Sequence, residues 1–197
     1  MSKVLRKLFK WSIQRIFPYY RLAHIYCVVP NQFCRSITAV EDAGATLEVD
    51  PPDMGSNIPA GWPSTGLTIP QVNFRLVVNG IEVSSCSIIR DTTADSENLW
   101  PVAGPERVEI TKLRTVEQFR GKGYAALLVS GVQTSMATIG IRAIHASIWH
   151  SNVASVHVFK ACGWRRIATV AKLKLIGTRA PLRIVIPGAQ CSRESGV

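Results

Sequence analysis

Short runs in which apolar and polar residues alternate predict a domain rich in β-strands. The stretch "FRLVVNGIEVSSCSIIR" gives two β-rich runs around Asn79-Gly80, a dipeptide that favours two-residue hairpin turns. Residues 107–116 and 143–149 form two more such runs, and "KLKLIG" and "LRIVIP" close the series. We therefore expect a hairpin, two further strands and a final strand pair.

Two segments show the spacing of helices instead. Residues 152–163 predict a short helix closed by Gly163, a residue that readily adopts the left-handed conformation of a helix end. Residues 123–139 predict a longer helix with four apolar side chains on one face: Leu128, Val132, Met136 and Ile139. The order of elements predicts an α/β (α+β) fold, with a mixed sheet flanked by helices.

Residues 1–20 place apolar side chains at helical spacing and lysines on the other side, until Pro18 ends the pattern. We predict an amphipathic N-terminal helix over residues 1–21 and a single domain over residues 22–197. Lys10 interrupts any secretory apolar core, whereas an arginine-containing start without acids also resembles an organelle transit peptide. A cationic amphipathic helix of this kind suits the surface of an anionic membrane.

Residues 41–70 are rich in glycine, proline, aspartate and serine, and we interpret them as a long irregular loop. The chain has 197 residues, 47% of them hydrophobic, which suffices for one domain with a full core. It holds no run of about 18 apolar residues, so a spanning helix is not expected. The five cysteines include no CxxC pair, which disfavours a disulfide framework or a zinc site and favours the cytoplasm.

The net charge of +10 is unevenly distributed. Residues 41–117 hold five Lys/Arg and twelve Asp/Glu, whereas residues 118–197 hold eleven Lys/Arg and one acid. A surface so rich in cations suits a polyanionic partner: nucleic acid, anionic lipid or a phosphate-rich small molecule. A solvated basic face without any ligand is the simpler alternative.

The segment "EQFRGKGYAALLV", residues 117–129, sits between a predicted strand and a predicted helix. Glycines let the backbone approach a phosphate, and the first N–H groups of a helix have no partner within it. The spacing does not fit a P-loop, GxxxxGK[ST]. GxGxxA fits a dinucleotide fold, but no acid follows at about 20 residues for the ribose, which leaves only a weak NADP version using Arg142.

Two motifs together resemble the GNAT N-acyltransferase superfamily. "RGKGYA" resembles its R/Q-x-x-G-x-G/A signature, and "NVASVHVFKACGW" resembles its second motif, carried by Asn152, Ala154, Ser155, Gly163 and Trp164. The resemblance covers roughly residues 74–176 and implies a mainly antiparallel GNAT-like sheet. It also implies acetyl-CoA, or another acyl-CoA, as the acyl donor. The expected cofactor contacts are Leu113, Thr115, Arg120, Gly121, Lys122, Gly123, Tyr124, Ala125, Asn152, Ser155 and Phe159.

The implied reaction is direct attack of an amine on an acyl thioester, without a covalent enzyme intermediate. The attacking ammonium must first lose a proton. We predict that Glu109 is the base, since its place before Arg120 resembles a family glutamate, and Glu106 is the second choice. Phe159 occupies the position of the family's tyrosine acid, so His150, His157 and Cys162 become candidates for the acid.

The resemblance does not name the acceptor. The amphipathic start suggests an amino sugar or an envelope precursor, acylated by a peripheral enzyme at the inner face of a membrane. The alternatives are a protein N-acetyltransferase, a catalytically weak CoA-binding module and, on charge alone, a nucleic-acid-binding module. No recognised RNA-binding signature supports the last, and no motif predicts a metal site. The sequence leaves oligomeric state open.

Overall fold

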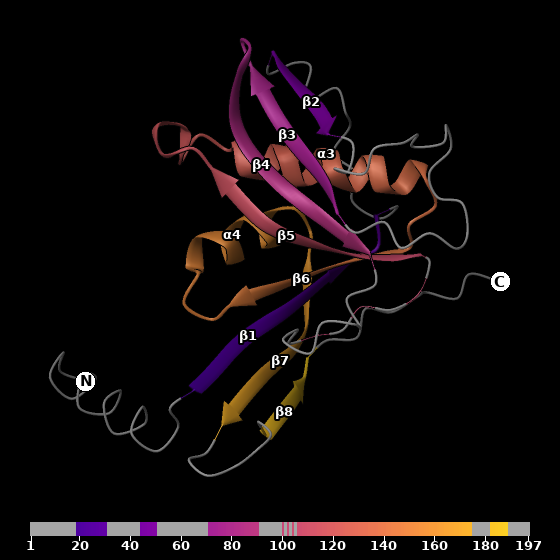
Figure 1. Cartoon of the computed structure of the whole chain (residues 1–197), viewed down its shortest axis with the longest axis vertical. Coiled ribbons are helices and arrows are strands. Elements are labelled where there is room, and N and C mark those ends of the chain that lie inside the picture. Colours follow the sequence, from indigo (N-terminus) through magenta and orange to yellow (C-terminus); the bar gives the residue numbers. More distant parts are fainter. Residues whose placement is uncertain are drawn as a thin grey trace, which may run out of the picture.

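The computed structural model describes residues 19–30, 44–50, 71–90, 100, 102, 104, 106–174 and 182–188. Its centre is an eight-stranded sheet in the order β2-β3-β4-β5-β6-β1-β7-β8 (Figure 1). All neighbouring pairs are antiparallel except β5 and β6, which are parallel. The strands are β1 (Tyr19–Val28), β2 (Ala45–Asp50), β3 (Val72–Val78), β4 (Ile81–Arg90), β5 (Arg107–Thr115), β6 (Ala143–Trp149), β7 (Arg165–Lys174) and β8 (Leu182–Pro187).

The predicted hairpin, the strands over residues 107–116 and 143–149, and the two helices over residues 123–139 and 152–163 are confirmed. The final strand pair is also present, although β7 begins at Arg165, well before the predicted strand at KLKLIG. Asn79 and Gly80 both have positive φ, 51° and 75°, as a two-residue turn between β3 and β4 requires. The longer predicted helix is α3 (Tyr124–Thr138) and the shorter one is α4 (Val153–Ala161). A single 3₁₀ turn, η2 (Glu117–Phe119), joins β5 to the glycine turn.

Two elements differ from the prediction. Strand β1 begins at Tyr19, so the predicted boundary at residue 21 falls inside a strand. This strand lies between β6 and β7 and is buried on both faces. Its sequence therefore lacks the alternation of apolar and polar residues from which a strand can be predicted. Residues 45–50 of the predicted irregular loop form edge strand β2, which pairs with β3. Residues 41–43 and 51–70 of that loop, and residues 1–18, lie outside the described residues.

The main core fills the space between one face of the sheet and the two helices. The predicted stripe on α3 is nearly correct, because Leu128, Val132 and Met136 are buried whereas Ile139 is partly exposed. α4 is anchored to α3 through Trp164, whose Nε1 donates to Gln133 Oε1 at 3.2 Å. These contacts fix α4 beside the parallel strand pair.

The parallel strands β5 and β6 separate soon after they meet. They pair at only three positions, residues 107–109 with residues 143–145. Beyond this point the β5 edge that faces β6 has no strand partner, and the two strands diverge on either side of α4 (Figure 1). This divergence is the feature of the fold that opens a site.

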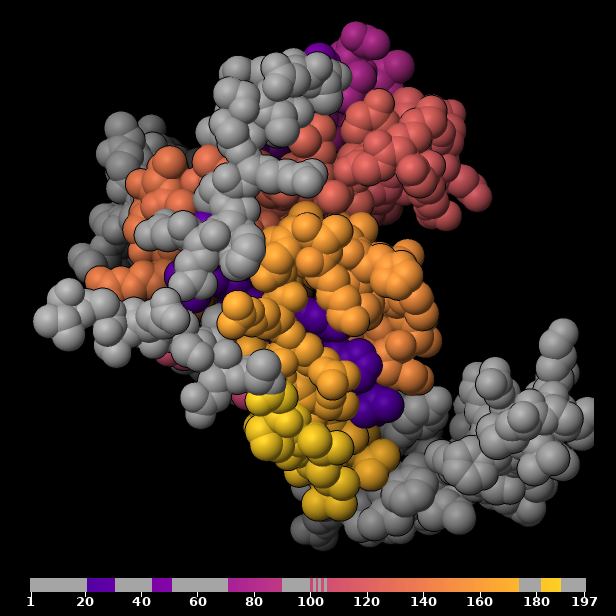
Figure 2. All heavy atoms as spheres, turned by 180° about the vertical axis from the view of Figure 1, so that it is seen from behind, coloured from indigo at the N-terminus to yellow at the C-terminus, as the bar shows by residue number. Residues whose placement is uncertain are grey.

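At the far edge of the sheet, neither α3 nor α4 packs against β8. β8 shows its apolar side chains to solvent, and its yellow atoms are uncovered in the space-filling view (Figure 2). Within the part of the chain that the structure describes, no helix combines the length and apolar character needed to cross a membrane.

Candidate functional site

The glycine turn between η2 and α3 has the backbone that its sequence predicts. Gly121 and Gly123 have φ of 76° and 84°, in the left-handed region that other residues adopt only under strain. Gly123 is the N-cap of α3, and no acidic residue occupies the first turn. The first N–H groups of α3 and the positive end of its dipole therefore form a site for an anion.

This turn borders a cavity of about 460 Å³, the turn cavity. Arg114 and Arg120 line it without any acid among the lining residues, so its charge suits a phosphate-rich group. Arg120 is held back toward the strand, because its Nε donates to Thr115 O at 3.3 Å. On the opposite wall, Asn152 caps α4, with its Oδ1 accepting from Ser155 N at 3.1 Å. These residues fit a CoA pyrophosphate.

A second cavity, the splay cavity, has a volume of about 370 Å³ and lies where β5 and β6 diverge. Leu113, Asn152 and Ser155 line both cavities, so the two are continuous. Glu109 lines the splay cavity and is only 3% exposed. A carboxylate that borders a cavity yet is shielded from bulk water is suited to remove a proton from a bound amine.

A β-bulge shapes the β5 wall of the splay cavity. Ser85 pairs with Arg114 and Ser87 with Thr111, so Cys86 alone faces two residues, Lys112 and Leu113. Lys112 has a φ of 53°, which is uncommon for a residue other than glycine. The bulge bends β5 at the point where its edge faces the cavity instead of a neighbouring strand. Backbone N–H groups beyond the bulge are therefore candidate donors to a developing oxyanion.

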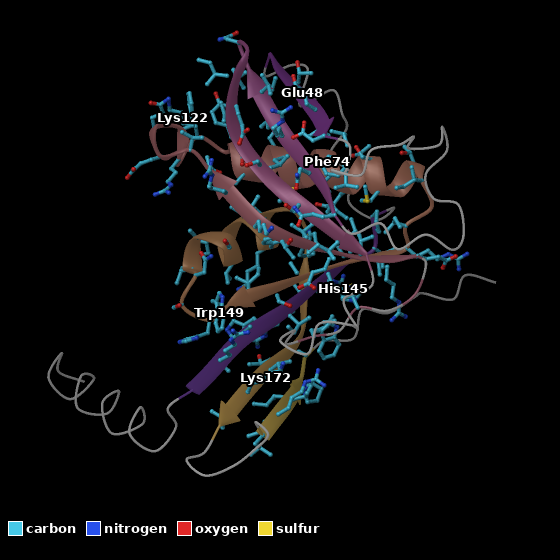
Figure 3. The ribbon with its side chains drawn as sticks, in the orientation of Figure 1. Glu48, Phe74, Lys122, His145, Trp149 and Lys172 are labelled. Atoms are coloured by element: carbon cyan, nitrogen blue, oxygen red, sulfur yellow. The ribbon has the colours of Figure 1, made fainter. Side chains whose placement is uncertain are left out.

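Most of the predicted cofactor residues come together around these two cavities. Phe159 lines the splay cavity and is buried against Trp164, with ring centroids 4.6 Å apart. Lys122 is the exception, because it lines neither cavity and its Nζ lies 5.4 Å from the Phe119 ring centroid. Figure 3 shows Lys122 at the outer tip of the turn. The predicted residues that line the turn cavity are Leu113, Thr115, Arg120, Gly121, Gly123, Tyr124, Ala125, Asn152 and Ser155.

The predicted acids have less favourable positions. His150 and His157 are exposed and line neither cavity, and His150 Nδ1 lies 3.3 Å from Leu22 O. Cys162 is buried, and its Sγ donates to Ala126 O at 3.4 Å. The second-choice base, Glu106, forms an ion pair with Arg142 at 2.9 Å, which also engages the arginine of the NADP alternative. Glu109 alone among the predicted acid–base groups borders the splay cavity.

Several residues that line the splay cavity were not predicted as site residues. Arg21 and Ala23 reach the splay cavity from β1, a strand that the pattern did not predict. Trp149, at the end of β6, lies with the Arg21 guanidinium 6.0 Å from its ring centroid (Figure 3). An exposed tryptophan at the end of a predicted strand is the one signal that could have marked this wall.

His145 lies beside Glu109 in the parallel ladder, where the two are Cα partners. Burial, together with the nearby Arg107 guanidinium, lowers the pKa of His145 from 6.5 to about 4. Its Nδ1 has no hydrogen-bond partner among the described residues. His145 is therefore neutral at physiological pH and adds no charge beside Glu109.

Residues 85–164 match the family model described as acetyltransferase (GNAT) family. This segment, less than half of the chain, is therefore similar to the GNAT acetyltransferases that its two motifs resemble. The matched segment runs from β4 through the glycine turn to Trp164, so it includes both cavities' main walls. A comparison with curated proteins gave no match.

Solved structures show the same fold at low sequence identity. A GCN5-related N-acetyltransferase from Kribbella flavida is 13% identical with a TM-score of 0.52, over 80% of this chain and 59% of its own. Another from Sphaerobacter thermophilus is 15% identical with a TM-score of 0.52, over 89% and 57%. A glucosamine N-acetyltransferase region in a fungal multi-domain GH3 β-N-acetylglucosaminidase is 12% identical with a TM-score of 0.52, over 85% and 22%. The chain thus spans less than two thirds of each of these proteins.

Proposed function

We propose that the chain is an acetyl-CoA-dependent N-acyltransferase that acylates a primary amine. The observation that carries this proposal is the continuity of the turn cavity with the splay cavity, in which Glu109 lies. The first cavity has the charge and backbone to bind a pyrophosphate, and the second has a shielded carboxylate. The match of residues 85–164 to the GNAT acetyltransferase family model supports the same function.

Different residues of the two cavities bind the cofactor and transfer the proton. The N–H groups of the turn and of the first turn of α3 bind phosphate, and Arg114 and Arg120 add positive charge. Acetyl-CoA, when bound, supplies an acetyl thioester. Glu109 accepts a proton from the incoming ammonium and so produces the nucleophilic free amine. N–H groups of β5 beyond the bulge at Lys112 stabilise negative charge on the acyl oxygen.

In the splay cavity, no described phenol, imidazole or thiol takes the place of the family's tyrosine acid. The splay cavity contains Phe159 at that position, and the described residues that line it include no tyrosine, histidine or cysteine. We therefore propose that the departing thiolate is protonated by water. The cations Arg21 and Lys112 in the same lining favour the thiolate electrostatically.

Thiol release from acetyl-CoA tests the proposal. The purified chain is mixed with acetyl-CoA and a panel of amines: glucosamine, cyclohexylamine, and a lysine-containing peptide. Acetyl-CoA binding is measured separately by calorimetry. Amine-dependent thiol release, with an acetylated amine in the mass spectrum, supports the proposal, and tight acetyl-CoA binding without release from any amine contradicts it.

Phe159 favours one alternative, a catalytically weak module that binds CoA as a ligand. Under this alternative the turn cavity is used and Glu109 is not. Acetyl-CoA affinity would then be high, while turnover would be no faster with the wild-type chain than with Glu109→Gln.

Association with a membrane remains a separate prediction, because it rests on residues 1–18. Co-sedimentation with vesicles of phosphatidylglycerol and phosphatidylcholine, with and without residues 1–18, measures it. Equal sedimentation of both forms contradicts the prediction without affecting the proposed chemistry.

A further inference from the structure

A third cavity of about 370 Å³, the strand cavity, lies on the side of the sheet away from α3. Lys112 lines both the strand cavity and the splay cavity, so the strand cavity is next to the proposed reaction centre. Its walls come from β2, β3, β4 and β5 and carry hydrogen-bond donors and acceptors together. The lining residues are Asp50, Gln71, Asn73, Arg75, Glu82, Ser85, Cys86, Ser87, Lys112 and Arg114.

Four of these side chains form a closed network. Gln71 Nε2 donates to Asn73 Oδ1 at 2.8 Å and to Ser87 Oγ at 3.1 Å. Ser87 Oγ donates to Asn73 Oδ1 at 2.8 Å, and Lys112 Nζ donates to Gln71 Oε1 at 3.2 Å. These bonds fix the four side chains before any ligand arrives. Asn73 Nδ2 and two of the three Lys112 protons have no protein partner among the described residues and remain for a ligand.

The network stands at a defined spacing from Glu109. Thr111 pairs with Ser87, and Glu109 pairs with Ile89, so Glu109 and Ser87 belong to the same face of the sheet. Two residues along a strand span about 6.6 Å. A ligand whose amine lies at Glu109 therefore reaches the network with groups about one sugar ring away.

We propose that the strand cavity binds the hydroxyl groups of the acceptor and makes the chain selective for an amino sugar. This inference rests on the proposed function, because Glu109 fixes the position of the amine. A hydroxyl group both donates and accepts, and so it can satisfy a site that offers both kinds of partner. A lysine side chain offers only methylenes next to its amine, which would leave the Asn73 Nδ2 donor without an acceptor from the ligand.

Two other charged residues of the cavity, Asp50 and Arg75, are already paired with each other. Arg75 Nη2 lies 2.5 Å from Asp50 Oδ1 and 3.4 Å from Glu48 Oε2. Figure 3 shows Glu48 at the same end of the sheet, on β2. The ion pairs hold the β2 wall in place, and the neutral amides and hydroxyl of the network are left to recognise the sugar.

The test compares two amines of similar ring size, glucosamine and cyclohexylamine, as acceptors. Asn73→Ala and Ser87→Ala each remove one member of the network. Thr134→Ala is the matched control, because its hydroxyl donates to Ser130 O within α3, on the other side of the sheet. We expect each network variant to lose about fivefold to tenfold in kcat/KM for glucosamine, chiefly through KM, since one hydrogen bond contributes about 1 kcal/mol. Cyclohexylamine turnover should change less than twofold, as should both activities of the control.

Equal losses for the two amines, or none for glucosamine, overturn the inference. Binding separates it from the proposed function, so saturation-transfer NMR follows glucosamine on the full chain without acetyl-CoA. Suppose that no amine is acetylated, yet glucosamine binds the wild-type chain and binds Asn73→Ala more weakly. The proposed function then fails, but the inference that the strand cavity binds an amino sugar is supported. If neither the kinetics nor the NMR experiment detects glucosamine binding to the wild-type chain, the inference is overturned. Thermal melts of both variants exclude unfolding as the cause of a loss.

Discussion

The turn cavity and the strand cavity each share lining residues with the splay cavity but are built in different ways. The turn cavity is lined mainly by two continuous segments, residues 113–126 and 152–158, and its key groups are backbone N–H donors. The strand cavity is lined by side chains from four strands, and two of its lining residues, Asp50 and Arg114, are 64 positions apart in the sequence. They come together only because the strands pair in a specific register. A local segment can create a phosphate site, whereas recognition of an acceptor needs distant strands in register.

The largest expected effect is at the centre of this comparison, at Glu109. Glu109→Gln should lower kcat/KM for the amine about 10²–10³-fold at pH 7, because the amine loses its base. Acetyl-CoA affinity should stay unchanged, since the turn cavity is intact. The activity should partly recover at high pH, where the free amine forms without help. Steady-state kinetics from pH 6 to pH 10 measure all three.

Glu106→Gln is the matched control for that variant. Glu106 is partly exposed and pairs with Arg142, just before the start of β5. Its loss should leave kcat/KM within about twofold, because surface ion pairs contribute little. Equal losses in the two variants would show that Glu109 acts through strand stability instead of proton transfer.

A second effect concerns pH and the wall beside Glu109. The folded-state pKa of His145 is about 4, below its ordinary 6.5, so the unfolded chain binds the extra proton between these values. The free energy of unfolding should therefore fall by up to about 3 kcal/mol as pH drops from 6.5 to 4. Urea unfolding of the wild-type chain and of His145→Asn should show a smaller pH dependence in the variant. The same slope in both would remove His145 as the cause.

The glycine turn gives a third, smaller effect. Gly121→Ala and Gly80→Ala place a Cβ at nearly equal positive φ, 76° and 75°, with no atom within 4 Å in either case. Both should lose about 1 kcal/mol of stability from backbone strain. Only Gly121→Ala should weaken acetyl-CoA binding, by about tenfold, because its turn forms the phosphate site. Calorimetry that finds equal affinities in the two variants would separate the turn from the cofactor.

The smallest effect is expected at the cap of α4. Asn152→Ala removes the acceptor for Ser155 N and should cost about 1 kcal/mol, or roughly 2–4 °C in Tm. Asn152→Ser retains a cap oxygen and should recover most of this stability. If acetyl-CoA affinity falls in both variants, the amide group itself contacts the cofactor. If it falls only in the alanine variant, helix order is the cause.

Much of the fold could be predicted because its signals are local. Asn79-Gly80 specified a turn through two positive φ angles, and Leu128, Val132 and Met136 specified the buried face of α3. The RGKGYA turn predicted its own cavity, since glycines and helix N–H groups act within a few residues. Strand β1 was missed because a strand buried on both faces has no alternation, and nothing local says that it pairs with β6 and β7.

The sequence by itself determined the glycine turn, its cations and the two GNAT-like motifs, because neighbouring residues carry each of them. Only the tertiary structure decided what lies next to that turn. Glu109 lines the splay cavity, whereas Lys122, His150 and His157 line neither the splay cavity nor the turn cavity. One hydrogen-bonded network in the strand cavity joins four side chains: Gln71, Asn73, Ser87 and Lys112. The reason is physical: strand register and the divergence of β5 from β6 bring distant residues together, and neither is encoded in any one segment.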